Sequence, residues 1–253
     1  MKKHLFILPI LSLFFATPMW AAFDVTPIVL TAAPSGPNAT VTLQATNNGD
    51  AKTPIQIAIY HREPDIDGKE DYEKAKDASD LFQIIPSQII LAPKEKRTIR
   101  ITYVGEPRIN IEQAFRFIAE EFPIDVSDSS KVKNKTVAAI SIVSRYIGSL
   151  YVKPAGVAAI LTFETAIDKD PKETKMVLTI KNTGTEHKIL SDTKYNFLTT
   201  ADKKQYPISA ETLKSIGNHN ILPGKTRKIS FPWPKEIPVG PVKIVPEPVA
   251  VKN

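Results

Sequence analysis

The sequence has 253 residues and contains no cysteine. Without cysteine, a disulfide framework, a thiolate zinc site, an iron–sulfur cluster and a cysteine nucleophile are all excluded. Long hydrophobic runs are missing too. The run from Leu5 to Phe15, interrupted by Ser12, has about 11 residues, whereas a membrane-spanning helix needs about 20. We therefore expect no stable insertion into a membrane.

Motifs for catalysis and metal binding are absent as well. The chain contains no H-E-x-x-H, no G-x-S-x-G and no phosphate-cradling glycine loop. Adjacent residues on a strand point to opposite faces, so Glu120 and Glu121 are poorly placed to act as a catalytic pair. None of the histidines, His4, His61, His187 and His219, sits at metal-ligand spacing. The sequence predicts a protein that is not an enzyme and that needs no metal or other cofactor.

Proline content and net charge argue against two further classes of protein, helical bundles and nucleic-acid-binding proteins. The 21 prolines make up about 8% of the chain, above the usual ~5%, and proline interrupts helix interiors. A helical bundle is therefore disfavoured. The formal charge of +6, from 33 basic and 27 acidic side chains, is too small and too dispersed to indicate a nucleic-acid partner.

The first 22 residues have the order of a secretory signal. Lys2 and Lys3 belong to a basic n-region, the apolar run is the h-region, and Ala21 and Ala22 are the small residues of a cleavage site. We expect cleavage after one of these two alanines. Because cleavage removes two lysines, the mature chain would carry a charge of +4. The pattern predicts an exported protein.

After the signal, apolar and polar residues alternate with a period of two, which indicates β-strands. Turn residues separate the strands, and the two halves share an Asn-x-Gly turn after an early strand, at Asn47 and at Asn182. The expected strands cover residues 40–45, 55–59, 82–85, 89–91, 98–104 and 114–121 in the first half and 158–166, 175–181, 195–198, 226–231 and 240–245 in the second.

Short strands separated by such turns predict an all-β fold made of antiparallel sandwiches. The charged stretch from Arg62 to Asp80 is expected to be a loop, mostly in solvent, with room for one helical turn at residues 72–78. We place a domain boundary at Pro154. The expected organisation is a signal at residues 1–22 and two immunoglobulin-like domains at 23–153 and 154–253.

The segment from Thr136 to Val152 is a strand candidate of unusual length. It has about 17 residues, where 5–6 is typical, and apolar residues occupy both of its faces. A long edge strand of this kind would invite pairing with another chain. A central strand with a kink near Gly148 would instead be buried on both faces. Both interpretations remain open on this pattern alone.

Several segments, in their order along the chain, resemble periplasmic pilus and fimbrial assembly chaperones of the PapD-like superfamily. Ala114–Pro123 is rich in aromatic residues and ends in Glu-x-Pro, like the penultimate strand of their first domain. The arginine between Phe115 and Phe117 resembles the archaic or alternative branch of that family. The other matching segments are Asp24-Val25-Thr26-Pro27-Ile28, Leu150-Tyr151-Val152-Lys153-Pro154, Ile221-Leu222-Pro223-Gly224 and Phe231-Pro232-Trp233-Pro234.

The resemblance implies two immunoglobulin-like sandwiches set as a boomerang in the bacterial periplasm. Members of the family bind pilin or fimbrial subunits that lack a final strand and deliver them to an outer-membrane usher. The last strand of the first domain fills the gap by donor-strand complementation, a form of β-augmentation. Matched to this sequence, the donor face falls on Ala138, Ile140, Ile142 and Ser144.

The resemblance also implies an anchor for the subunit's C-terminal carboxylate. The family's usual basic positions match Val29 and Ser149, and neither side chain is a cation. Arg116 is the first substitute and Arg145 the second, because a planar guanidinium can bind a carboxylate with two hydrogen bonds. Two further residues, Glu121 and Lys153, match positions of an interdomain salt-bridge network.

A second function class remains open from the sequence. A secreted two-domain structural or adhesive protein would share the immunoglobulin-like fold but would keep its long strand paired internally. For a chaperone, by contrast, an exposed strand edge can pair with a second copy of the chain. We therefore also expect that the subunit-free protein can form a self-capping dimer.

Overall fold

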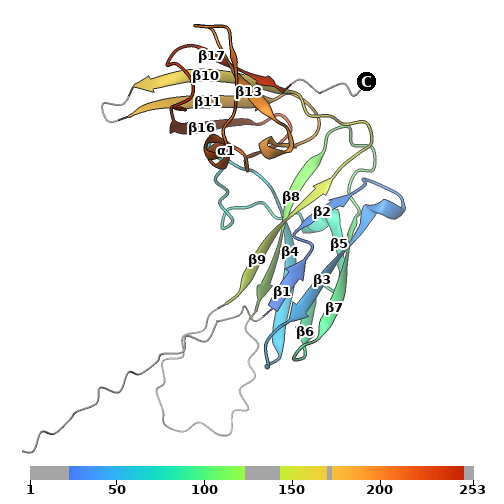
Figure 1. The fold of residues 1–253 in the computed structure, drawn as a ribbon. Coiled ribbons are helices and arrows are strands. Elements are labelled where there is room, and N and C mark those ends of the chain that lie inside the picture. Colours follow the sequence, from blue (N-terminus) through green and yellow to red (C-terminus); the bar gives the residue numbers. More distant parts are fainter. Residues whose placement is uncertain (1–22, 123–142, 170–172, 248–253) are drawn as a thin grey trace, which may run out of the picture.

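The computed structural model describes residues 23–122, 143–169 and 173–247. These residues form two β-domains set at an angle to each other and joined near Pro154 (Figure 1). The described part of the chain holds one α-helix, α1 (Ala210–Ile216), and is otherwise built from strands and loops with three short 3-10 helices. The prediction of an all-β fold with two β-domains is confirmed.

The first domain is a sandwich of two sheets, antiparallel except where β2 pairs with β9. One sheet has the strand order β1 (Phe23–Thr26), β3 (Thr40–Asn47), β7 (Lys96–Tyr103) and β5 (Phe82–Ile85). The other has the order β2 (Val29–Ala32), β9 (Arg145–Val152), β8 (Gln113–Glu121), β4 (Thr53–His61) and β6 (Gln88–Leu91). The 3-10 helices η1 (Pro37–Ala39) and η2 (Ser79–Leu81) lie between strands.

The core of the first domain follows the period-two pattern. Phe115 and Phe117 on β8 are completely buried between the sheets, as are Ile55 and Ile59 on β4. Each fully buried side chain of this size contributes about 1.5–3 kcal/mol to folding. Because alternate residues face opposite ways, Arg116 between the two phenylalanines points away from this core.

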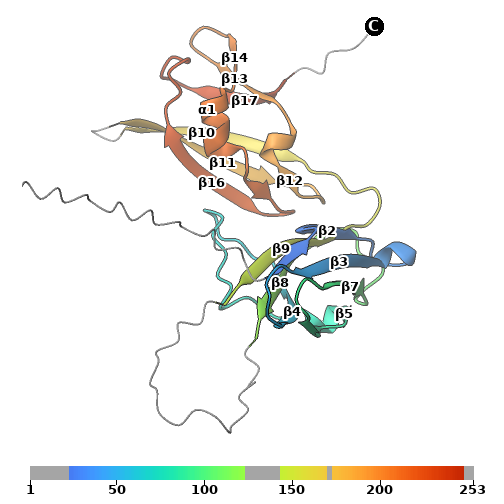
Figure 2. The same ribbon diagram turned by 60° about the horizontal axis from the view of Figure 1, so that its bottom comes forward.

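The second domain contains two three-stranded sheets and one two-stranded sheet (Figure 2). Its buried core draws on residues between Met176 and Ile244. A 3-10 helix, η3 (Leu190–Asp192), precedes β13. One three-stranded sheet has the order β10 (Leu161–Lys169), β11 (Thr174–Asn182), β16 (Thr226–Pro232). The other has the order β14 (Gln205–Pro207), β13 (Tyr195–Thr199), β17 (Val242–Pro246). The two-stranded sheet pairs β12 (Lys188–Ile189) with β15 (Asn220–Ile221).

The shared Asn-x-Gly turn has the same structural role in both domains. Asn47 and Asn182 are completely buried, and each side-chain amide donates to backbone carbonyls across the turn. Each side-chain oxygen accepts from the glycine two residues later, at 2.9 Å and 3.0 Å. The asparagines therefore satisfy backbone groups that the turn would otherwise leave unpaired.

Two local predictions are corrected. β9 begins at Arg145, so Val143 and Ser144 are not part of a continuous strand, and residues 136–142 of the predicted strand lie outside the described residues.

The helix α1 was not expected; its N-cap is Ser209, whose hydroxyl accepts from the Thr212 amide at 3.3 Å. One short helix of seven residues leaves little periodic signal in a sequence dominated by alternation.

Candidate functional site

An open strand edge marks one side of the first domain. Along β9, strand β8 pairs with the whole length on one side, whereas β2 pairs only with Ser149 to Val152 on the other. Of the strands that the structure describes, none pairs with that second edge between Arg145 and Gly148. A strand edge of this kind is a template for pairing with a further strand.

Three neighbouring strands set a row of side chains beside this edge. The β2–β9 register pairs Val29 with Ser149, and the β9–β8 register pairs Ser149 with Arg116. The Arg116 guanidinium donates to the Ser149 hydroxyl at 2.6 Å. Ser149 and Val29, which the resemblance matches to the family's basic positions, therefore lie in one row with Arg116, one and two strands away.

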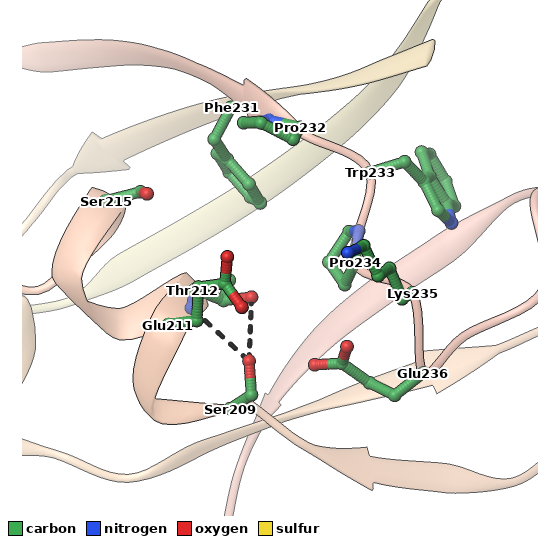
Figure 3. Close-up of a pocket in the computed structure, with 10 residues that line it drawn as sticks. All are labelled: Ser209, Glu211, Thr212, Ser215, Phe231, Pro232, Trp233, Pro234, Lys235 and Glu236. Carbon is green, nitrogen blue, oxygen red and sulfur yellow. Dashed lines mark hydrogen bonds between the residues drawn. The ribbon is translucent and has the colours of Figure 1, made fainter. Parts of the chain in front are cut away.

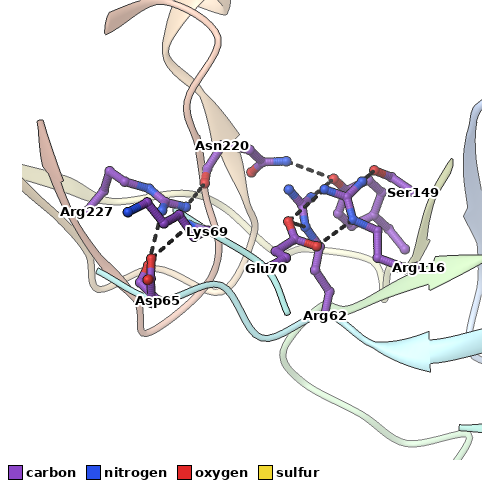
Figure 4. A network of polar contacts seen from close by, with 9 residues as sticks. Arg62, Asp65, Lys69, Glu70, Arg116, Ser149, Asn220 and Arg227 are labelled. Atoms are coloured by element: carbon purple, nitrogen blue, oxygen red, sulfur yellow. Dashed lines mark hydrogen bonds and ion pairs between the residues drawn. The ribbon is translucent and has the colours of Figure 1, made fainter. Parts of the chain in front are cut away.

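Arg116 already holds a carboxylate. Its Nε and Nη2 atoms each donate to one oxygen of Glu70 at 2.7 Å, a bidentate pair shown in Figure 4. Arg62 Nε donates to the same carboxylate at 3.0 Å. The side chains of Glu70 and Arg62 are only 10% and 9% exposed, so solvent screens this cluster weakly.

The electrostatics of the cluster favour the charged forms. Burial by itself would raise the pKa of Glu70, but the hydrogen bond from Arg116 and the charges of Arg62 and Arg116 outweigh it, and the pKa lies below the ordinary 4.5. Burial likewise opposes the charge of Arg116, and Glu70 overcomes it, so the pKa of Arg116 is raised. The site is therefore one carboxylate clamped by two arginines.

The loop that carries Glu70 continues into contact with the second domain. The Asp65 carbonyl accepts from Arg227 at 3.1 Å, and the Ile66 carbonyl accepts from the Lys228 amide at 2.8 Å. Gly68, at φ +89°, lies directly against the Arg227 guanidinium. The loop is mostly exposed, as expected, but Glu70 and the carbonyls of Asp65 and Ile66 bind groups of the two domains.

Other contacts join the two domains around Tyr151. The Tyr151 hydroxyl accepts from Arg62 of the first domain and from Asn220 of the second, each at 2.7 Å. Its ring stacks on His187, with centroids 4.0 Å apart and planes 9° apart. The buried Glu112 accepts from His187 Nδ1 at 2.6 Å. The first-domain strands and the second domain therefore share one polar junction.

The predicted salt-bridge residues lie at opposite ends of the sheet. Lys153 pairs with Glu186 of the second domain. Glu121 lies beyond the pairing of Glu120 with Arg145, level with Ser144, so roughly 30 Å separates it from Lys153 along the strand direction. The assignment of Glu121 to the interdomain network is therefore corrected: the register of β8 and β9 carries it to the far end.

Arg145 does not share the Arg116 site. It pairs with Glu120 at 2.7 Å and lies within 3.6 Å of Glu73. Ser149 lies four positions further along β9, a distance of roughly 13 Å along the strand. Arg145 is also 45% exposed, so its ion pairs are weaker than those of Arg116.

Comparison with known proteins identifies the family. The family described as "Pili and flagellar-assembly chaperone, PapD N-terminal domain" matches residues 24–158, more than half of the chain. The chain belongs to this chaperone family. A search of curated proteins finds no match.

Solved structures show that both domains follow the chaperone fold. The chaperone in the CsuC–CsuE pre-assembly complex from archaic Csu pili of Acinetobacter baumannii has 16% identity and a TM-score of 0.53, covering 89% of this chain and 93% of that one. The class 5 fimbriae chaperone CfaA has 15% identity and a TM-score of 0.52, covering 90% and 99%. A chaperone–tip adhesin complex of CFA/I fimbriae matches at 17% identity and a TM-score of 0.52, covering 82% and 88%.

The Pro232-Trp233-Pro234 segment of the second domain has a structural role. Trp233 donates its ring N–H to the Ile237 carbonyl at 3.2 Å, and its amide bonds to Thr174 at 2.9 Å. These bonds hold the chain where β16 ends. Figure 3 shows the small hollow of about 100 Å³ between this segment and α1, lined by residues that include Ser209, Phe231 and Glu236.

Sequence reasoning missed two residues of the cluster, Arg62 and Glu70. Both lie in a stretch whose charge pattern is typical of a solvated loop, so nothing local distinguishes them. Of the predicted donor residues, Ala138, Ile140 and Ile142 lie outside the described residues. Ser144 is half-buried, and its carbonyl accepts from the Glu121 amide at 3.2 Å.

The described residues provide neither a bilayer-crossing helix nor a metal cluster. Within residues 23–122, 143–169 and 173–247, no helix is long and apolar enough to cross a membrane. The same residues contain no group of three or more His, Cys, Asp or Glu side chains that could hold a metal ion.

Proposed function

We propose that this protein is a periplasmic chaperone that binds pilin or fimbrial subunits by donor-strand complementation and delivers them to an outer-membrane usher. The observation that carries the proposal is the open edge of β9 from Arg145 to Gly148, next to the cationic Arg116 site. Membership of the pilus assembly chaperone family supports it. The likeness of the CsuC fold is compatible with the archaic branch, which we retain as part of the proposal.

The proposed donor face gives this edge its specificity. Main-chain hydrogen bonds would satisfy the subunit's open edge whatever the side chains are. Ala138, Ile140, Ile142 and Ser144 alternate along one face and would fill the subunit's groove. Each isoleucine buried there would contribute about 1.5–3 kcal/mol, which gives affinity and leaves release to the usher feasible.

Arg116 is the proposed anchor for the subunit's C-terminal carboxylate. Its guanidinium lies mid-strand, faces away from the core and already binds a carboxylate in bidentate geometry. The family's usual basic positions, Val29 and Ser149, adjoin it in the sheet. The anchoring charge would thus have moved by one strand without leaving the surface that a subunit would cover.

The decisive experiment is co-expression with candidate pilins and recovery of the subunit on the tagged chaperone. Ile140→Asp and Ile142→Asp should reduce recovery at least tenfold, because a carboxylate would enter an apolar groove. Val143→Asp is the matched control, since alternation places Val143 on the other face of the proposed donor strand and its side chain is 56% exposed. Circular dichroism checks that each variant is folded. Full recovery with both isoleucine variants would contradict donor-strand complementation through this segment.

The alternative of a structural or adhesive protein makes a different prediction for the free chain. It requires both edges of β9 to be paired internally and needs no labile subunit. A self-capping dimer remains our proposal for the subunit-free chaperone. Sedimentation of the purified protein distinguishes a dimer from a monomer.

A further inference from the structure

We propose that Glu70 is an internal ligand of the two-arginine site and that the subunit's C-terminal carboxylate displaces it. This inference rests on the proposed function, since it names the regulation of that site. In the free chaperone, the loop from Arg62 to Lys76 would close the site. On subunit binding, an α-carboxylate would take the place of the Glu70 carboxylate.

The geometry of the Glu70 carboxylate is that of a bound ligand. Arg116 contributes two hydrogen bonds of 2.7 Å and Arg62 one of 3.0 Å. Arg116 Nη1 donates to the Ser149 hydroxyl at 2.6 Å, and Arg62 Nη1 donates to the Tyr151 hydroxyl at 2.7 Å. Both arginines are therefore oriented to bind a carboxylate. In the free chain, the loop from Arg62 to Lys76 supplies the carboxylate of Glu70.

A third arginine connects the loop of Glu70 to the second domain. Arg227 is 5% exposed, and its contacts are two backbone carbonyls, those of Asp65 and Asn220. Its buried Nε has no hydrogen-bond partner within the described residues. Figure 4 shows Arg227 beside Asp65 and Lys69, on the side of the network away from Arg116. The loop that carries Glu70 is therefore also bound to the second domain.

The loop can leave without breaking a core. It contributes no residue between Arg62 and Lys76 to either hydrophobic cluster. A hollow of about 200 Å³ opens beside the ion pair, lined by residues that include His61, Tyr72 and Arg116. Displacing Glu70 would also release the bonds of Asp65 and Ile66 to the second domain, so carboxylate binding would loosen the loop's hold on both domains.

The displacement has a measurable cost in apparent affinity. A site that its own loop occupies binds an external ligand more weakly, in proportion to the fraction of molecules in which it is free. Glu70→Gln keeps the size of the side chain but removes the charge that the arginines clamp. This variant should therefore bind a free carboxylate more tightly than the wild-type protein does.

The experiment uses two synthetic peptides with the C-terminal sequence of the recovered pilin subunit. One ends in a free carboxylate and the other in an amide. Calorimetry on the full mature chain should give at least tenfold tighter binding of the acid to Glu70→Gln than to wild type, and no change for the amide. Glu73→Gln is the matched control, because Glu73 lies on the same loop with its side chain 85% exposed.

The outcomes separate the two proposals. If wild type prefers the acid to the amide and Glu70→Gln binds the acid within twofold of wild type, the role of Glu70 is wrong and the carboxylate anchor stands. If wild type does not distinguish acid from amide, the anchor fails and Glu70 has no ligand to compete with. If wild type binds no pilin peptide or subunit, the proposed function fails and this inference with it.

A second measurement does not depend on the variant being folded. The Lys228 amide is held by the Ile66 carbonyl at 2.8 Å, so it reports on the closed loop. Addition of the acid peptide to wild-type protein should accelerate hydrogen exchange at Lys228, and the amide peptide should not. Unchanged exchange with the acid bound would overturn the displacement.

Discussion

At the scale of single residues, the buried arginines bind partners that lie far away in the sequence. Glu70 and Arg116 are 46 residues apart, and Arg227 is 162 residues from Asp65, whose backbone carbonyl it contacts. Each buried cation contacts either a carboxylate or backbone carbonyls. This arrangement satisfies the rule that charges removed from water need partners, and it concentrates the arginines where the two domains meet.

The anchoring role of Arg116 gives a prediction at this scale. Arg116→Ala should weaken subunit capture about 10–100-fold, because hydrogen bonds to charged groups contribute about 1.5–3 kcal/mol. Arg116→Lys should recover part of the affinity, since it keeps the charge but loses the planar fork. Titration of the chaperone against a purified subunit measures both effects.

Arg145→Ala serves as the comparison variant. Its residue lies roughly 13 Å from Ser149 along β9 and is half exposed, so its removal should change capture less than twofold. A larger loss with Arg145→Ala than with Arg116→Ala would make Arg145 the anchor.

At the scale of elements, the close packing of β8 against β9 depends on a glycine. A Cβ at Gly148 would lie 2.0 Å from the ring of Phe117 and 2.8 Å from the Ile28 carbonyl. Phe117 is completely buried, so its ring has no free space to enter. The glycine thus permits β9 to lie between β8 and β2, instead of marking the kink that the sequence suggested.

Gly148→Ala should lower the free energy of unfolding by about 1–3 kcal/mol, the usual cost of forcing extra volume into a packed core. Chemical denaturation measures the change. Gly240→Ala is the control, because a Cβ there would meet no atom within 4 Å. Adding Phe117→Leu to Gly148→Ala should restore part of the stability, and a double variant that is less stable than either single change would refute this explanation.

At the scale of the whole molecule, one polar junction connects both domains and the Arg62–Asp80 loop. Tyr151, Arg62 and Asn220 meet there through two hydrogen bonds of 2.7 Å. His219 lies beside Arg227 on the second-domain side. Burial, and then the charge of Arg227, lowers the pKa of His219 below its ordinary 6.5, although a backbone hydrogen bond at Ser215 opposes the shift.

The lowered pKa of His219 predicts how stability varies with pH. The unfolded chain binds the proton more readily, so this contribution to stability is complete above pH 6.5 and is lost as pH falls through the lower folded pKa. The free energy of unfolding of the second domain should therefore decrease between pH 7.5 and 5.5. His219→Gln should flatten that slope in denaturation curves, and an unchanged slope would assign the pH dependence to other groups.

The sequence by itself determined the β architecture and the family. Alternation of apolar and polar residues is a local property, so it predicted most strands and the buried faces of β4 and β8 from neighbours two residues apart. The motifs around Arg116, Leu222 and Trp233 likewise occupy continuous segments. Their order along the chain was sufficient to suggest the chaperone family that the comparisons established.

Only the tertiary structure decided which charges meet. In the register of β8 and β9, Glu121 lies at the end of the sheet remote from Lys153. Glu70 lies beside Arg62 and Arg116 because its loop packs on the second domain. No local pattern encodes such contacts, because they depend on how two strands align and on where a loop of many polar residues finds partners. The physical reason is that the interaction between two buried charges depends on the distance between them in space. Only the folded chain determines that distance.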